Sequence, residues 1–305
     1  MKYRLIIAVI SFLTFIELSC KKDNEIVENN QVPTYTGVSD VLIENYVNRV
    51  FIDLIGREPL DAEMEAEVAL LKEDTLSKAA RERLIIKLQT DTNFIQGDSS
   101  YQKAYFRQLY EGAKARILEG ASNDEINEVL GPLEFAYYED SINGDYAAAQ
   151  LVKYEINKLK LLLNSGYAYR QGLIDINGFY FRILNNAIYD QINMNTFNLI
   201  RASFDNLFFR YPSDTEFNIG FDMVENSMSG VLFGQPGQNK DDYLNILTQS
   251  NEFYEGLIIY AYRTLLARDP NPAESYKLLQ ELGSNKDYHQ LVRSIMMTDE
   301  YAHFD

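Results

Sequence analysis

Arg210-Tyr-Pro212-Ser-Asp-Thr-Glu216 is one of three segments with the pattern Arg-x-Pro-x-x-x-Glu, and these segments decide the expected fold. The other two are Arg57-Glu-Pro59-Leu-Asp-Ala-Glu63 and Arg268-Asp-Pro270-Asn-Pro-Ala-Glu274. Because proline disfavours a helical conformation of the residue before it, each segment predicts the end of a helix. The arginine suits the negative end of that helix dipole, and the glutamate can close a capping box on the next helix. Each segment therefore predicts a tight turn between two helices.

The residue after the proline is expected to cap the second helix of each turn. Ser213 and Asn271 are good N-cap residues, whereas the first segment has Leu60, for which Asp61 is the expected substitute. Two interpretations of the Arg–Glu pair are open: a binding pair for a ligand, or a structural lock. In the lock, the arginine holds the glutamate or the carbonyls at the helix end. We favour the lock because turn and capping chemistry explains each element of the pattern.

The similarity between the three segments extends to the sequence on both sides. Each follows an apolar face at helical spacing, and each is followed by a stretch of equal length. Those stretches, Leu84 to Phe94, Tyr243 to Phe253 and Leu291 to Tyr301, finish in Thr-Asn-Phe, Asn-Glu-Phe and Asp-Glu-Tyr. We therefore predict three helical repeats. They span residues 39–100, 201–254 and 255–305.

Residues 101–200 have helical spacings but no copy of the pattern. Their apolar stripes are Tyr105, Leu109 and Tyr110; then Leu151, Tyr154, Leu159, Leu162 and Leu163; then Phe179, Phe181, Ile183, Leu184, Ile188 and Ile192. Breaks are expected at Gly120 to Asn123, Asn143-Gly144, Gly166 and Asn177-Gly178. No alternating strand of useful length is present. The predicted fold class is all-α, a helical array of three helix-turn-helix repeats around a non-repeating helical middle segment.

Two parts of the predicted repeats resemble known helical domains. A helical domain of unknown function, found beside cytochrome-type modules in planctomycete proteins, has an opening similar to Val47-Asn-Arg-Val-Phe-Ile-Asp-Leu-Ile-Gly-Arg-Glu-Pro59. Small helical domains of secreted bacterial proteins, related to phycobilisome linkers, are similar to Tyr262-Arg-Thr-Leu-Leu-Ala-Arg-Asp-Pro270 with Thr298-Asp-Glu-Tyr301. These resemblances imply compact helical units used in interaction, and they imply no catalysis. The Cys-x-x-Cys-His of a c-type haem site is absent from the sequence.

The N-terminus is built like a bacterial lipoprotein signal. Lys2 and Arg4 precede an apolar run from Leu5 to Ile16, which is short for a membrane span but typical of a signal-peptide core. Cys20, the only cysteine, follows and is the expected lipidation site. The match departs from the common lipobox, which has leucine three residues before the cysteine, where this chain has Glu17. An ordinary secretory signal and a single-pass anchor are the alternatives.

These features predict a lipid-anchored address. The predicted segments are a signal peptide over residues 1–19 and a flexible tether over residues 20–38, polar and without periodicity. The start Cys20-Lys-Lys-Asp-Asn-Glu25 resembles lipoproteins from Bacteroidota, in which such residues often accompany export to the cell surface. We therefore expect attachment to the outer membrane, facing the periplasm or the cell exterior.

The charge of the chain limits its partners. Loss of residues 1–19 removes two positive charges and one negative charge, so the formal net charge changes from −17 to −18. Such a chain is repelled by nucleic acid and by anionic lipid headgroups, and we expect no nucleic-acid partner. With one cysteine, no intramolecular disulfide can form, so stability must come from packing.

The sequence offers little material for catalysis or metal binding. Its two histidines are His289, expected on a helix surface, and His303. Motifs of serine hydrolases, phosphate-binding loops and zinc proteases are absent. Asp140-Ser-Ile-Asn-Gly144-Asp145 and Asp175-Ile-Asn-Gly178 lack the ligand spacing of calcium loops and are interpreted as helix breaks. The segment Phe233-Gly-Gln-Pro-Gly-Gln238 is either a functional protrusion or, as we favour, a surface insertion.

The expected function is therefore interaction rather than catalysis. We predict a non-catalytic envelope lipoprotein, without a cofactor or metal, that acts as an interaction or scaffold subunit with other envelope proteins. The alternative is a surface lipoprotein that binds a glycan or another small ligand, suggested by the many tyrosines and asparagines. Among 45 acidic residues, a pair of carboxylates for a hydrolase also stays open as a third hypothesis.

Overall fold

Short polar side chains set most of the helix boundaries. In the computed structural model, which describes residues 35 and 37–304, the fold is all-α, as the sequence predicts. Ser39, for example, begins α2 by accepting the N–H of Leu42, and Gly56, with a φ of 77°, ends that helix. The helices are α2 (Asp40–Ile55), α3 (Asp61–Glu73), α4 (Lys78–Thr90), α5 (Tyr101–Ile117), α6 (Asn123–Asn143), α7 (Tyr146–Leu163), α8 (Ser165–Arg170), α9 (Ile176–Leu184), α10 (Ala187–Asn193), α11 (Thr196–Phe208), α12 (Asp214–Asn226), α13 (Lys240–Gln249), α14 (Asn251–Leu266), α15 (Pro272–Asn285), α16 (Tyr288–Met296) and α17 (Asp299–Ala302).

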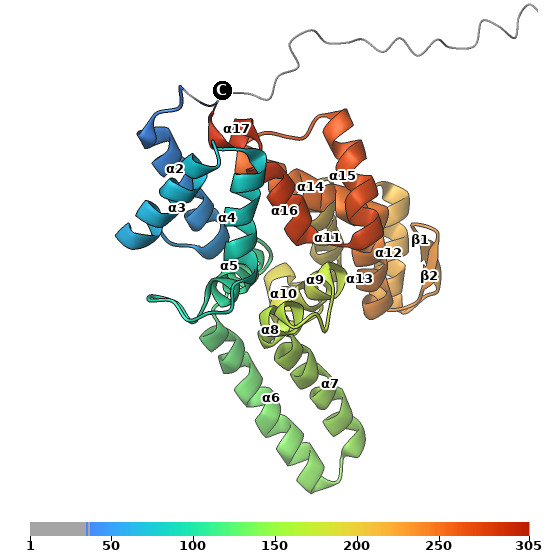
Figure 1. Cartoon of the computed structure of the whole chain (residues 1–305). Coiled ribbons are helices and arrows are strands. Elements are labelled where there is room, and N and C mark those ends of the chain that lie inside the picture. Colours follow the sequence, from blue (N-terminus) through green and yellow to red (C-terminus); the bar gives the residue numbers. More distant parts are fainter. Residues whose placement is uncertain (1–34, 36, 305) are drawn as a thin grey trace, which may run out of the picture. The chain divides into compact units, whose positions relative to one another are not determined.

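The helices return the end of the described chain to its beginning (Figure 1). α2, α3 and α4 pack together, α2 and α4 also contact α5, and α5 in turn contacts α8 and α9. Beyond α9, α13 contacts both α9 and α14, and α14 also packs against α11, α15 and α16. α16 then packs on α4, and α17 packs on α2. One hydrophobic core therefore joins helices from both ends of the described chain.

The predicted segment boundaries do not separate structural units. The boundary between residues 200 and 201 lies inside α11, and the one between residues 254 and 255 lies inside α14. The helix α14 follows the second Arg-x-Pro turn and also precedes the third, so it belongs to both predicted repeats. The described residues from Tyr35 onward form one compact unit, so the predicted repeats and middle segment are parts of a single unit.

Tyr35 already packs against the body of the protein, although the sequence assigns it to the tether. Its hydroxyl donates to Asp299 Oδ1 over 2.7 Å and accepts from Nη2 of the fully buried Arg81. Its ring lies edge-on to Phe304. Tyr35 therefore belongs to the folded body, and the predicted signal peptide, Cys20 and the predicted tether up to residue 34 lie outside the described residues.

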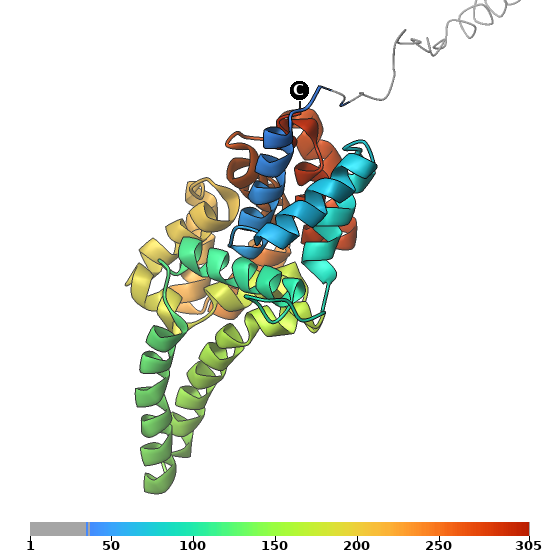
Figure 2. The same cartoon turned by 60° about the vertical axis from the view of Figure 1, so that its left-hand side comes forward.

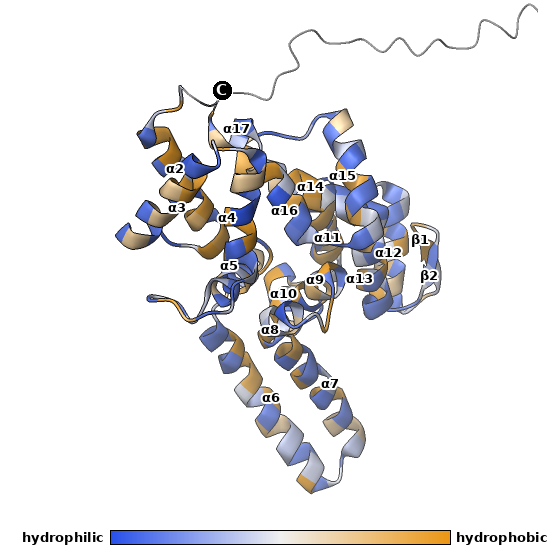
Figure 3. Ribbon diagram, in the orientation of Figure 1, coloured by the Kyte–Doolittle hydropathy of each residue, from blue (hydrophilic) through white to orange (hydrophobic). Residues whose placement is uncertain are grey.

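Helices α6 and α7 form an antiparallel hairpin that extends from the other helices (Figure 2). The turn is built by Gly144, with a φ of 80°, and by Asp145, which caps α7 by accepting the N–H of Ala148. At its base, α7 contacts α8, α9 and α10. Coloured by hydropathy, both helices of the hairpin carry apolar residues along much of their length (Figure 3).

Two local predictions are wrong. Gly166 lies inside α8, and Asn177-Gly178 lies inside α9, because the chain turns earlier, before Asp175, which caps α9. Asn177 is buried there and donates to Tyr254 Oη over 2.9 Å. The break at Asn143-Gly144 is confirmed.

The segment from Phe233 to Gln238 belongs to a small β-hairpin. Strands β1 (Gly230–Leu232) and β2 (Gln235–Gly237) are antiparallel, with Leu232 opposite Gln235. β1 contacts α12 and β2 contacts α13. The ring of Phe233 packs against Phe204 and Phe208. This insertion is therefore packed onto the helices around it.

Candidate functional site

The three Arg-x-Pro-x-x-x-Glu turns make the same set of contacts. In each, the arginine donates two hydrogen bonds of 2.7–2.9 Å to the glutamate six residues later and one to the next carbonyl. The glutamate also accepts the N–H of the residue after the proline. These pairs are Arg57–Glu63, Arg210–Glu216 and Arg268–Glu274. Bidentate pairs of this kind fix the geometry of both partners.

The first turn is capped differently from the prediction. Asp61 is the first residue of α3, and Leu60 occupies the N-cap position without a side-chain cap. Glu63 compensates, since its carboxylate accepts the Leu60 N–H over 2.7 Å. Hydrogen bonding from the arginine has a large electrostatic effect in the second turn, where Arg210 lowers the pKa of Glu216 to about 2.

A second carboxylate completes each of the three arginine sites. Arg210 also pairs with Glu252, in the first turn of α14, and Arg268 pairs with Glu300, in the first turn of α17. Arg57 instead pairs with Asp98, from the loop before α5. The predicted equivalence of Phe94 with Phe253 and Tyr301 is therefore wrong, because Phe94 is 83% exposed while the other two are buried. Each arginine serves two carboxylates and one carbonyl within the fold.

His289 is half-buried among aromatic rings, whereas the sequence predicts that it lies on a helix surface. Its Nδ1 lies 2.8 Å from Tyr105 Oη, and its ring stacks on Tyr169 at 5.0 Å. Phe106 lies edge-on at 5.1 Å. Burial lowers the pKa of His289 to about 4, and the nearby Arg293 adds to this effect while Asp287 opposes it. The imidazole is therefore neutral at pH 7.

Acidification is expected to destabilise the protein through His289. Below pH 6.5 the unfolded chain binds a proton at this position that the folded chain does not, so stability falls as the pH drops towards about 4. Between pH 7 and 4.5 we expect the wild type to lose about 2 to 3 kcal/mol more than His289→Phe, as measured by urea unfolding. Equal losses in the two proteins would show that the imidazole titrates normally in the fold.

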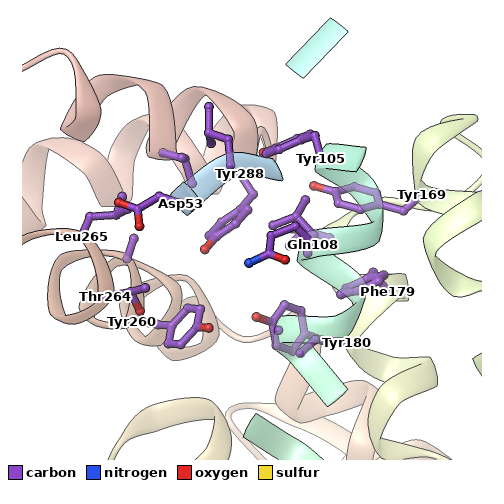
Figure 4. A pocket seen from close by; sticks show the side chains of 17 residues that line it. Asp53, Tyr105, Gln108, Tyr169, Phe179, Tyr180, Tyr260, Thr264, Leu265 and Tyr288 are labelled. Atoms are coloured by element: carbon purple, nitrogen blue, oxygen red, sulfur yellow. The ribbon is translucent and has the colours of Figure 1, made fainter. Parts of the chain in front are cut away.

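A cavity of about 120 Å³ lies between α2, α5, α8, α9, α14 and α16 (Figure 4). Thr264 is exposed, and Asp53, Gln108 and Tyr260 are half-buried, so these residues form its mouth. The floor is buried and mostly aromatic. The aromatic residues that line the cavity are Tyr105, Tyr169, Phe179, Tyr180, Tyr260 and Tyr288.

Several polar groups converge on the centre of this cavity. The hydroxyls of Tyr180, Tyr260 and Tyr288 and the amide of Gln108 point inward (Figure 4). Within the described chain, Tyr180 and Tyr288 have no hydrogen-bonding side chain beside their hydroxyls, and burial raises the pKa of both. The Tyr169 hydroxyl is buried without a partner in residues 35 and 37–304. A buried hydroxyl without a partner is uncommon, so the Tyr169 hydroxyl, together with the hydroxyls that point into the cavity, indicates a polar guest.

Asp53 is the single charged residue among those that line the cavity. Its Oδ2 accepts the Tyr301 hydroxyl over 2.7 Å and lies 3.8 Å from Arg49 Nε. Arg49 is not part of the lining, and its other nitrogens donate to the carbonyls of Leu265 and Tyr301. Burial raises the pKa of Asp53, although Tyr301 and Arg49 oppose that shift. Tyr301 thus fixes the orientation of a partly desolvated carboxylate.

The distal hairpin carries the second candidate site, an apolar surface that we call the hairpin patch. Its residues are Phe135, Tyr138, Ile142, Tyr146 and Leu151, each between 62% and 72% exposed. Phe135, Tyr138 and Ile142 follow one another at helical spacing along α6. Residues 131–154 contain four acidic side chains and one lysine, so the patch has an acidic border. Phe135, Tyr138 and Ile142 share one face of α6, and exposed apolar side chains gathered in this way are typical of interaction sites.

Sequence reasoning missed both candidate sites, although each left a signal. Asp53 is a lone charge within the apolar run from Val50 to Ile55, which indicates a carboxylate facing the interior. Leu151 and Tyr154 belong to a predicted apolar stripe, but Leu151 is 72% exposed, and the Tyr154 hydroxyl donates to Asp241. A long hairpin with apolar residues on more than one face indicates an unpartnered surface.

The described residues contain no cluster of three or more His, Cys, Asp or Glu side chains able to hold a metal ion. In the same part of the chain, no helix is both long and apolar enough to cross a membrane. Comparison with known proteins finds no matching family model, no matching curated protein and no matching solved structure.

Proposed function

We propose that this protein is a non-catalytic scaffold or interaction subunit, attached to the outer membrane through a lipidated Cys20. The observation that carries the proposal is the hairpin patch. It exposes five large apolar side chains on two helices that, among the elements of residues 35 and 37–304, contact mainly each other and extend away from the rest (Figure 2). Leaving such surface in water is unfavourable by about 25 cal/mol per Å², and covering it drives association.

The partner is another envelope protein whose contact surface combines apolar side chains with lysine or arginine. Exposed Glu139 and Asp145 lie among the residues of the patch in sequence, and Glu128 lies one to two turns before Phe135. A basic rim on the partner would complement these carboxylates and favour one docking orientation. An anionic lipid surface is disfavoured for the same reason.

Removing the apolar side chains of α6 is expected to abolish partner binding without unfolding the protein. The variant Phe135→Ser/Tyr138→Ser/Ile142→Ser should lose its partner at least tenfold, since exposed side chains contribute little to folding. Tagged proteins would be purified from native membranes in mild detergent, and the copurifying proteins compared. The matched control is Leu173→Ser/Met194→Ser/Tyr276→Ser, which removes equally exposed apolar side chains elsewhere.

A partner retained by the wild type and the control but lost from the α6 variant supports the proposal. Charge gives a second test: Glu139→Lys and 0.5 M NaCl should each weaken that complex at least threefold. If all three proteins copurify with the same set, or none binds anything, the hairpin patch is not a docking surface.

A further inference from the structure

We propose that the cavity between α2, α5, α8, α9, α14 and α16 binds a small primary ammonium ion on a short aliphatic body, with Asp53 as its counter-ion. This site is distinct from the hairpin patch, so its test and the partner-binding test succeed or fail separately.

Size limits the ligand. A cavity of roughly 150 Å³ accommodates benzene, which has six non-hydrogen atoms. The 120 Å³ of this cavity therefore suits a molecule of about five to seven such atoms. A hexose, with twelve non-hydrogen atoms, is too large to enter completely. The cavity thus favours a small amine over the sugar unit of a glycan.

The charge and the aromatic rings of the cavity wall determine the sign of the ligand's charge. Among the described residues that line the cavity, Asp53 alone carries a formal charge, and Arg49, 3.8 Å from it, lies outside the lining, so an anion would meet no cation in the cavity wall. A cation gains both the carboxylate and the negative faces of the surrounding aromatic rings. The inward hydroxyls of Tyr180 and Tyr288 can accept hydrogen bonds from an ammonium group, which has only donors.

The arrangement of these groups defines a pose. Asp53, Tyr260 and Gln108 lie at the mouth of the cavity, and the hydroxyl of the buried Tyr288 points inward beside them, so the ammonium would sit among these groups (Figure 4). The aliphatic body would then extend towards Phe179 on the buried floor. Asp53 Oδ2 is held by Tyr301, so Oδ1 is the oxygen left for the ligand.

An ammonium group on an aliphatic stem can come from two sources. One is a free small amine, whose body would be enclosed in the cavity. The other is the side chain of a lysine that a protein inserts through the mouth, with its stem leading back to solvent. Both kinds of ligand would use the same carboxylate and tyrosine hydroxyls. A lysine with both backbone ends blocked, Nα-acetyl-lysine N-methylamide, distinguishes the two sources.

The experiment is titration of the full chain with n-butylammonium at pH 7.5 and constant ionic strength, by calorimetry and NMR. We expect a Kd of about 1 mM, within the range open to five non-hydrogen atoms. Asp53→Asn should weaken binding at least tenfold and Tyr288→Phe about threefold. Glu44→Gln, which removes an exposed carboxylate from the same helix, should change nothing. The neutral isostere n-butanol should bind at least tenfold more weakly than n-butylammonium.

Absence of binding at 50 mM n-butylammonium would overturn the proposal, as would equal affinity for n-butanol or for the Asp53→Asn variant. If circular dichroism shows that Asp53→Asn fails to fold, the Tyr288→Phe result decides, because that change removes only a hydroxyl. Binding of Nα-acetyl-lysine N-methylamide at least as tight as that of n-butylammonium would identify a protein lysine as the source. Weaker binding of the blocked lysine would identify a free amine, and both results uphold the site.

Discussion

Gly256→Ala is expected to destabilise the protein by about 4 kcal/mol or more, because two helices meet backbone to backbone at this residue. Gly256 is buried in the middle of α14, where α11 packs against it. A Cβ added there would overlap the carbonyl oxygen of Leu207 and lie 2.9 Å from its carbonyl carbon. Neither atom belongs to a side chain that can rotate away, so the helices must separate.

Gly283→Ala is the matched control. Gly283 also lies in a helix, α15, but it is exposed and a Cβ there would meet nothing within 4 Å. Alanine has the higher helix propensity, so this change should stabilise by up to about 1 kcal/mol. Urea unfolding followed by circular dichroism measures both variants. A loss below about 1 kcal/mol for Gly256→Ala would mean that α11 and α14 are farther apart than described.

The sequence predicts those parts of the fold that depend on neighbouring residues. The capping boxes at Ser213 and Asn271 are present as expected, because each joins residues only three positions apart. The all-α class follows from apolar spacing within single helices. These predictions need no knowledge of which helix packs against which.

Features made by distant segments could not be predicted in the same way. The aromatic shell of His289 comes from α5 and α8, more than a hundred residues earlier, and only the packing of α16 brings them together. The cavity at Asp53 likewise joins six helices. Apolar periodicity also does not reveal whether a partner is present, so Leu151 resembles a core residue in sequence and is exposed in the structure.

The first turn illustrates how a distant residue changes the energetics of a local motif. Asp98 stands in for the helix-start glutamates of the other two turns, and its side chain is 1% exposed. It accepts Arg57 Nε over 2.9 Å and Arg107 Nη2 over 2.6 Å. In the third turn, by contrast, Arg268 and Glu300 are 35% and 46% exposed. The Arg57–Asp98 pair is therefore shielded from water, whereas the equivalent Arg268–Glu300 pair lies in contact with it.

Arg57→Met is accordingly expected to cost about 3 to 4 kcal/mol, whereas Arg268→Met should cost about 1 kcal/mol or less. The large effect arises because Asp98 keeps its charge in a buried place with one cation fewer, while Glu274 and Glu300 stay hydrated. Methionine keeps much of the apolar stem of the arginine, so the change reports mainly on the guanidinium, whose carbon lies 5.7 Å from the centre of the Phe51 ring. Urea unfolding at pH 7 measures both variants.

A double-mutant cycle identifies the partner responsible. Asp98→Asn should cost more stability in the wild type than in the Arg57→Met background, because the asparagine removes the charge that Arg57 neutralises. The difference, which is the coupling energy of the two residues, should be about 1 to 3 kcal/mol. The cost of Arg57→Met should also fall at low pH. Arg57 lowers the pKa of Glu63 against the effect of burial, so the stability that this pair contributes is present above the unfolded pKa of 4.5. That stability is lost as the pH falls through the lower pKa of the folded state, because the carboxyl is then protonated. Equal costs for Arg57→Met and Arg268→Met, or no coupling to Asp98, would mean that burial does not set the strength of these turns.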